Sequence, residues 1–146
     1  MKGLWYARRI AQSIFGRIMI TMALIGCAAQ GPPFEPAPLT HPQSVIYVYR
    51  PYRIFGSAIR PPITCGDSTV KLGPGGYHPF VVEPGTIVCS TQYEASDTVE
   101  VHAAPGQSNY IEEEIGWGAL IGHPHLHPMD LDTAQNAISN CCELQE

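Results

Sequence analysis

Runs of β-branched and aromatic residues, separated by glycine and proline turns, follow one another along most of the chain. The clearest run is Val-Ile-Tyr-Val-Tyr at residues 45–49, which fits a pleated, half-buried core strand. We expect further strands at residues 62–65, 69–72, 77–82, 86–93, 98–102, 108–115 and 126–131. Short strands at this spacing predict a mainly β fold, a small antiparallel β-sandwich.

Helical spacing of apolar residues is found near the C-terminus. Ala134, Ala137, Ile138 and Cys141 recur at intervals of three or four residues, as on one face of a helix. Residues 132–135 (Asp-Thr-Ala-Gln) resemble a capping box just before this pattern. The sequence therefore predicts one short C-terminal helix after the strands.

The first quarter of the chain has a different pattern. Residues 1–17 carry four cations and no acid, and residues 18–25 form an uncharged apolar run. This order is typical of a secretory signal peptide. The run is shorter than the roughly 20 residues that a membrane-spanning helix needs. The alternative is an N-terminal membrane anchor that is never cleaved.

The signal ends in Leu24-Ile25-Gly26-Cys27, which resembles the bacterial lipobox. The resemblance implies cleavage between Gly26 and Cys27 and attachment of diacylglycerol to the Cys27 sulfur, so that the mature protein is held to a membrane by lipid. Ala28, where an aspartate would signal retention, implies the outer membrane in a Gram-negative bacterium. We therefore expect no cofactor apart from this covalently bound lipid.

Residues 28–43 contain five prolines and have almost no apolar period. We interpret them as a polyproline-like spacer that could reach roughly 45 Å when fully extended. The alternative is an N-terminal arm that belongs to the domain. The expected organisation is a signal peptide at residues 1–26, a lipidated cysteine with a proline-rich linker at 27–43, and a β-sandwich domain at 44–146.

Composition and charge narrow the range of partners. The chain has 146 residues with 14 glycines and 14 prolines, which favours short strands and turns. Its formal charge is −5, but four of its eight cations precede Cys27, which leaves four cations against thirteen acids in the mature part. This balance argues against nucleic-acid binding, and it disfavours adhesion to anionic lipid headgroups.

Four cysteines remain after lipidation: Cys65, Cys89, Cys141 and Cys142. An even number in an oxidising compartment predicts disulfides. The neighbouring pair has α-carbons only about 3.8 Å apart, below the usual disulfide range of roughly 4.4 to 6.8 Å. We therefore expect Cys65 to pair with Cys89. A redox-active dithiol is the functional alternative.

His123, His125 and His127 alternate along a short segment. In an extended chain their imidazoles point to one face, as a zinc or copper site requires. Pro124 and Pro128 interrupt the segment, and proline in a strand usually marks an edge or a bend. The favoured interpretation is a solvated histidine-rich loop, and a metal site is the alternative.

Three consecutive glutamates lie on the strand expected at residues 108–115. Alternation places Glu112 and Glu114 on one face, and Glu113 on the other face with Ile111 and Ile115. Paired carboxylates can act in acid–base catalysis, but they more often form a solvated face or guard a sheet edge. A hydrolase using these carboxylates is therefore the least favoured function.

Aromatic residues are frequent in the expected strands and turns. Such side chains could line a binding face, but in strands they usually fill the core. We expect core positions for most of this set: Tyr47, Tyr49, Tyr52, Tyr77, Tyr93, Tyr110 and Trp117.

One family resemblance rests on an ordered series of short motifs. The series is Val-Ile-Tyr-Val-Tyr-Arg-Pro at residues 45–51, Gly-Gly-Tyr at 75–77, Pro-Gly at 84–85, Asn-Tyr-Ile at 109–111 and a Gly-x-Pro-x-Leu step at 122–126. It resembles the domain of unknown function 2846 family of bacterial envelope proteins, over roughly residues 44–142. The resemblance implies a transthyretin-like or PEGA-like sandwich and carries no catalytic residue. The four cysteines and the histidine-rich segment depart from it.

The expected function is that of a cell-envelope lipoprotein whose domain is a non-enzymatic binding or structural module. Its expected partners are the membrane, through the lipid, and another envelope protein or a cell-wall component. A metal-binding lipoprotein that uses His123, His125 and His127 is the alternative.

Overall fold

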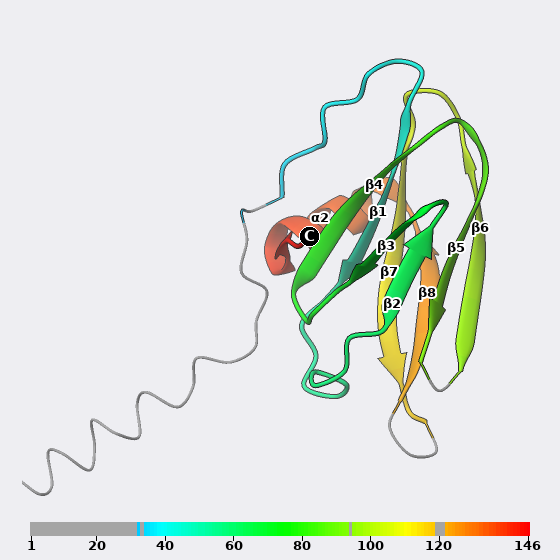
Figure 1. The fold of residues 1–146 in the computed structure, drawn as a ribbon. Coiled ribbons are helices and arrows are strands. Elements are labelled where there is room, and N and C mark those ends of the chain that lie inside the picture. Colours follow the sequence, from blue (N-terminus) through cyan, green and yellow to red (C-terminus); the bar gives the residue numbers. More distant parts are fainter. Residues whose placement is uncertain (1–31, 33, 94, 119–121) are drawn as a thin grey trace, which may run out of the picture.

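The computed structural model of the chain describes residue 32 and residues 34–93, 95–118 and 122–146. These residues form two β-sheets that pack face to face, with one helix outside them (Figure 1). The elements are β1 (Ser44–Arg50), β2 (Pro62–Cys65), β3 (Ser68–Lys71), β4 (Gly76–Val82), β5 (Gly85–Gln92), β6 (Ser96–Ala103), β7 (Ser108–Gly116), β8 (His123–Met129), α2 (Leu131–Cys141) and β9 (Glu143–Leu144).

The mainly β class, the two-sheet architecture and the single C-terminal helix agree with the sequence-based expectation. One sheet has five strands in the order β8-β7-β1-β4-β9, and the other has four in the order β3-β2-β5-β6. Most pairings are antiparallel, but β1 and β7 run parallel, as do β4 and β9. The chain leaves the five-stranded sheet after β4, forms β5 and β6 in the other sheet, and returns as β7 in the direction of β1.

The main core lies between the two sheets. Alternate residues of each strand point into it, as the period of two requires. Its fully or almost fully buried members come from both sheets: Ile46, Val48, Ile63, Cys65, Val70, Leu72, Phe80, Cys89, Val101, Ile111 and Leu126.

Every residue of β1 is buried, although the sequence predicted a half-buried strand. The reason is a third layer on the outer face of the five-stranded sheet. There Tyr47 and Tyr49 of β1 pack against Ala134 and Ile138 of α2. A central strand covered on both faces is apolar at consecutive positions instead of alternating, which explains the Val-Ile-Tyr-Val-Tyr run.

The proline-rich segment completes this third layer and is part of the domain from Phe34 onward. The Phe34 ring makes edge contacts with the rings of Tyr47 and Tyr77, at centroid distances of 5.4 and 5.3 Å. The backbone N–H of Ala37 donates a hydrogen bond of 2.7 Å to the Tyr47 hydroxyl. The expected spacer over residues 28–43 is therefore wrong from Phe34 on, because its apolar side chains cover aromatic rings of the sheet.

Helix α2 begins earlier than the capping-box pattern indicated. Asp130, in an extended conformation, is the N-cap, and its carboxylate accepts a 2.9 Å hydrogen bond from the backbone N–H of Thr133. This bond satisfies one of the free N–H groups at the helix start. Ala134 and Ile138 are buried, as the helical spacing predicted.

Both cysteine pairs form disulfides. Cys65 and Cys89 lie opposite each other in the β2–β5 register, with α-carbons 4.2 Å apart, as expected. Cys141 and Cys142 are also joined, with α-carbons 3.7 Å apart. The expectation against a bond between neighbouring cysteines is therefore wrong for this pair, which lies at the junction of α2 and β9.

Replacing Cys65 and Cys89 together by alanine is expected to lower the free energy of unfolding by about 3 kcal/mol, because the bond spans 24 residues of sequence and restricts the unfolded chain. Urea unfolding without reductant measures the change. Adding reductant to this variant should then shift its midpoint little, since the remaining Cys141–Cys142 bond closes only a minimal loop. Equal midpoints for the wild type and the double variant would contradict the prediction.

Candidate functional site

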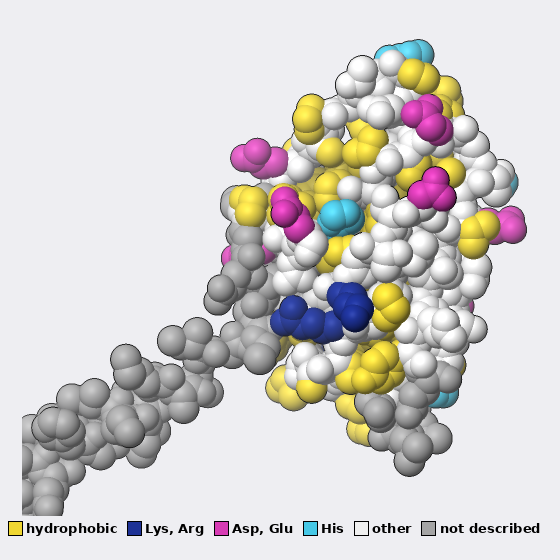
Figure 2. Space-filling view, in the orientation of Figure 1, with side chains coloured by type: hydrophobic (Ala, Val, Ile, Leu, Met, Phe, Trp, Pro, Cys, Tyr) yellow, Lys and Arg dark blue, Asp and Glu magenta, His cyan; other side chains and the backbone are white. Residues whose placement is uncertain are grey.

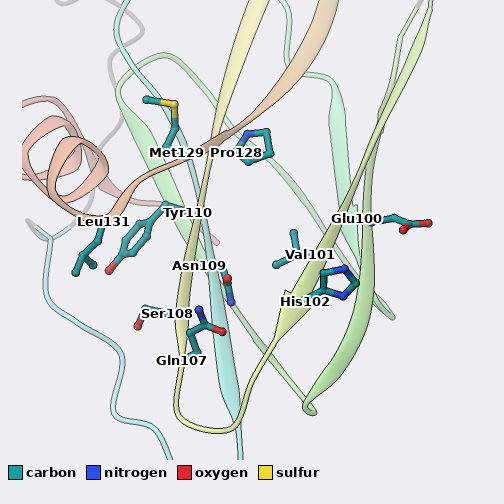
Figure 3. Close-up of a pocket in the computed structure, with 10 residues that line it drawn as sticks. All are labelled: Glu100, Val101, His102, Gln107, Ser108, Asn109, Tyr110, Pro128, Met129 and Leu131. Carbon is teal, nitrogen blue, oxygen red and sulfur yellow. The ribbon is translucent and has the colours of Figure 1, made fainter.

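A groove opens at one end of the sandwich, between β6 and the β7–β8 pair, with a volume of about 400 Å³. It exists because β8 ends at Met129, opposite Tyr110, where the Asp130 cap turns the chain into α2. The β7 residues before Tyr110 consequently have no β8 partner. The groove is lined by Glu100, Val101, His102, Gln107, Ser108, Asn109, Tyr110, Pro128, Met129 and Leu131 (Figure 3).

Asn109 is the most informative residue of the groove. It occupies the same face of β7 as Ile111 and Glu113, so its side chain points between the sheets toward β6. Figure 3 shows Asn109 on one side of the groove and Val101 and His102 of β6 on the other. The Asn109 Nδ2 is buried and has no hydrogen-bond partner among the described residues. A buried N–H donor of this kind costs free energy unless an acceptor reaches it.

The rim of the groove offers further polar groups. Glu100 and His102 are exposed on β6, and the His102 Nδ1 lies 3.2 Å from the Thr86 hydroxyl. The groove thus combines an apolar wall from Val101, Met129 and Leu131 with hydrogen-bonding groups. Polar and apolar groups line the groove in about equal measure. A concave site with placed hydrogen-bonding groups can orient a bound ligand, and this lining suits a polar ligand better than an apolar one.

A buried ion pair lies between the sheets at the opposite end of the sandwich. The Arg50 Nη1 is 3.7 Å from a Glu113 carboxylate oxygen, and both side chains are almost fully buried. Arg50 also donates hydrogen bonds to three backbone carbonyls: from Nη1 to Ile59 at 2.9 Å and Leu72 at 3.2 Å, and from Nη2 to Gly56 at 2.7 Å. The guanidinium therefore fixes the loop at residues 51–61 to the end of β3.

Burial and the partner charge act in opposite directions on the pKa of each member of this pair. Burial raises the pKa of Glu113 to about 7, and the positive charge of Arg50 opposes the rise. Burial also lowers the pKa of Arg50, while Glu113 counteracts the effect. Neither Glu113 oxygen has a hydrogen-bond partner among the described residues. The expectation of a solvated glutamate face is wrong for Glu113, although its predicted orientation with Ile111 and Ile115 is right.

The other two glutamates point outward, as alternation predicted. The Arg53 guanidinium is 2.7 Å from a Glu114 oxygen and 3.2 Å from a Glu112 oxygen, on the exposed surface of β7. The Tyr49 hydroxyl donates a 3.0 Å hydrogen bond to Glu112, and burial raises the pKa of that tyrosine. These carboxylates are thus engaged by a surface cation and a tyrosine.

The three histidines lie on strand β8, at the edge of the five-stranded sheet, and not in a loop. Alternation directs His123, His125 and His127 to the outer face while Pro124 and Leu126 face inward. His125 is 3.8 Å from Asp97, His127 is 3.6 Å from Glu114, and the rings of these two histidines are 6.1 Å apart.

No group of three His, Cys, Asp or Glu side chains in the described part of the chain is arranged to hold a metal ion. The histidines share a face, as expected, but they are spread along a strand, and His125 and His127 lie near separate carboxylates. Their arrangement therefore gives no support to the metal-binding alternative.

The predicted cleavage and lipidation positions, Gly26 and Cys27, lie outside the described residues, as does the signal peptide at residues 1–26. Within the described ranges no helix has the length and apolar character needed to cross a membrane. Among the aromatic residues, Tyr47, Tyr49, Tyr77 and Tyr110 are buried as expected. The exceptions, which are exposed, are Tyr52, Tyr93 and Trp117.

The groove and the ion pair were not identified as sites from the sequence. A signal for both exists in the β7 pattern, where Asn109 and Glu113 occupy inward positions alternating with Ile111 and Ile115. A polar residue at an inward position of a strand is unusual, and it therefore indicates a buried polar contact or a site.

Comparison with known proteins gives no relative: no family model, no curated protein and no solved structure matches the chain. The resemblance to the domain of unknown function 2846 family therefore stays an expectation. The function has to be argued from the residues themselves.

Burial of the Glu113 carboxyl predicts a pH-dependent stability. The folded-state pKa of Glu113, about 7, lies above its ordinary value of 4.5, so stability from this group is present below pH 4.5 and is lost as pH rises through 7. Replacing Glu113 by glutamine should remove this dependence, which is worth on the order of 3 kcal/mol. Urea midpoints of Glu113→Gln and wild type, compared at pH 5 and pH 8, measure it.

The matched control is Glu114→Gln, an identical change at the neighbouring outward position. It should keep the wild-type difference between pH 5 and pH 8. A Glu113→Gln variant with the same pH dependence as wild type would show that Glu113 does not hold its proton in the folded state.

Proposed function

We propose that this protein is a lipid-anchored lipoprotein of the bacterial cell envelope, held by Cys27, whose sandwich is a non-enzymatic binding module with the groove as its binding site. The Leu24-Ile25-Gly26-Cys27 sequence after an apolar run supports the anchor. The two disulfides are in keeping with an oxidising compartment outside the cytoplasm.

One observation carries the binding role: the buried Asn109 Nδ2 without a partner among the described residues, beside a groove of about 400 Å³. A ligand that presents a hydrogen-bond acceptor satisfies this donor and covers the apolar wall. Satisfying a buried polar group in this way favours such ligands over ones without an acceptor. Another envelope protein or a cell-wall component is the proposed partner class.

The anchor is tested by the intact mass of the protein purified from bacterial membranes. The wild type is expected to have the mass of residues 27–146 plus acyl chains, because the signal is removed before Cys27. Cys27→Ala should lack the acyl chains. A full-length, unmodified wild type would mean an uncleaved anchor and would refute the lipoprotein assignment.

The groove is tested by a photo-crosslinking residue placed at His102 in living bacteria. The same residue at Thr69 is the matched control, since β6 and β3 are the two edge strands of the four-stranded sheet and both positions are exposed. A specific product is expected at 102 only. Asn109→Leu should weaken its formation roughly tenfold, because a hydrogen bond to the ligand is lost.

Products of equal yield at positions 102 and 69, or a product at 102 that Asn109→Leu leaves unchanged, would argue against the groove. Either result leaves the anchor unaffected, since the two parts of the proposal are measured separately.

A further inference from the structure

Three apolar side chains, Ile54, Phe55 and Trp117, line one hollow at the end of the sandwich opposite the groove. Tyr52 is exposed in the same loop as Ile54 and Phe55, and we call these four residues the apolar end. Ile54 and Trp117 are each 84% exposed, and Tyr52 is 57% exposed. The Phe55 and Trp117 rings contact each other at a centroid distance of 4.1 Å. Large apolar side chains clustered in the open mark an interaction surface.

The backbone beneath the apolar end is held in place. Arg50 donates hydrogen bonds to the carbonyls of Gly56 and Ile59, and Ile59 itself is buried. Gly56 has a φ of +74°, and a side chain there would collide with Ile115. The loop at residues 51–61 is thus anchored by its interior residues while Ile54 points away from the core.

The N-terminal segment enters the domain at this same end. The Pro32 carbonyl accepts a hydrogen bond from the Leu144 N–H in β9, and β9 pairs with β4 at Gly76. Gly76 lies opposite Arg50, the residue after which the 51–61 loop begins. Trp117 follows β7, which runs parallel to β1, so it also lies at this end. Five residues from Cys27 to Pro32 reach at most about 18 Å.

The cations of the domain gather at this end, together with the Glu112, Glu113 and Glu114 carboxylates of β7. The described part of the chain contains four Lys or Arg residues, and all lie here: Arg50 at the end of β1, Arg53 and Arg60 in the loop, and Lys71 at the end of β3. Arg60 and Lys71 are exposed, whereas Arg53 is paired with Glu112 and Glu114. Figure 2 shows Lys and Arg side chains beside hydrophobic surface toward the lower end of the domain.

We infer that the apolar end docks into the headgroup region of the membrane that holds the N-terminus. The inference rests on the proposed lipid anchor, which confines the domain to within a short distance of the lipid surface. Trp and Tyr favour the membrane–water interface, where Trp117 and Tyr52 then lie, and Ile54 reaches the acyl boundary. Arg60 and Lys71 face anionic headgroups, whereas the net negative charge of the mature chain keeps its other faces from adhering.

The experiment uses Trp117 as its own reporter. The chain has two tryptophans, Trp5 and Trp117, so Trp5→Phe leaves one whether or not the signal is removed. This protein, purified from membranes, is reconstituted into phosphatidylethanolamine–phosphatidylglycerol vesicles with or without brominated acyl chains. We expect emission at shorter wavelength than in the urea-unfolded protein, loss of intensity with brominated lipid, and protection from acrylamide.

Two variants test whether the apolar end causes the effect. Ile54→Glu should restore much of the intensity lost to brominated lipid, because a charge cannot enter the acyl boundary. Val88→Glu is the matched control: Val88 is also an exposed aliphatic residue, but it lies in the middle of β5. It should leave the quenching unchanged.

Three results would overturn the inference. Vesicle-bound protein with acrylamide-accessible Trp117 refutes docking but leaves the anchor intact. Trp117 protected from acrylamide yet not quenched by brominated lipid means that a second protein copy covers the patch. A protein that does not float with the vesicles refutes docking. Its intact mass then shows whether the anchor has failed as well: a mass without acyl chains refutes the anchor, and a mass with them leaves the anchor intact.

Discussion

The buried guanidinium of Arg50 is the group on which the arrangement of this domain depends. Removing a charge from water is costly unless polar partners replace the lost solvent. Arg50 obtains them from three backbone carbonyls and from Glu113, and these partners belong to the 51–61 loop, the end of β3 and strand β7. The hydrogen bonds and the ion pair of this one side chain connect both sheets and the loop. The loop therefore follows a defined path, and its outward residues point in a defined direction.

The same strand that supplies Arg50 also explains the three layers. β1 is central in the five-stranded sheet, and its alternate side chains serve two different cores. Tyr47 directs its ring to the outer core and bonds the Ala37 N–H with its hydroxyl. A tyrosine buried in this way needs a partner for its polar end, and the proline-rich segment provides one. That requirement draws the segment onto the sheet, so that the residues from Phe34 onward belong to the domain.

The strands and the helix could be predicted because their local patterns are strong. Alternation correctly placed Glu113 inward and the three histidines on one face. What the sequence could not reveal was which residues meet across the sandwich: Arg50 with Glu113, and Asn109 with the β6 wall. The linker was misjudged for a similar reason, since proline content predicts an extended backbone but not whether Phe34 finds aromatic rings to cover. Long-range contacts of this kind depend on the order of strands, which local patterns do not contain.

The two ends of the domain suit two separate tasks. The groove lies beside Ser108, which pairs with Val45 at the start of β1, whereas the apolar end follows Arg50 at the end of β1. The length of a seven-residue strand, roughly 23 Å at about 3.3 Å per residue, therefore separates them. In the proposed docked arrangement the groove faces away from the membrane, so that the proposed partner reaches Asn109 without displacing the domain. A second hollow, of about 570 Å³, lies at the apolar end itself, where Ile54, Phe55 and Trp117 contribute to its lining. In the proposed arrangement lipid covers that hollow, whereas the groove beside Asn109 stays open.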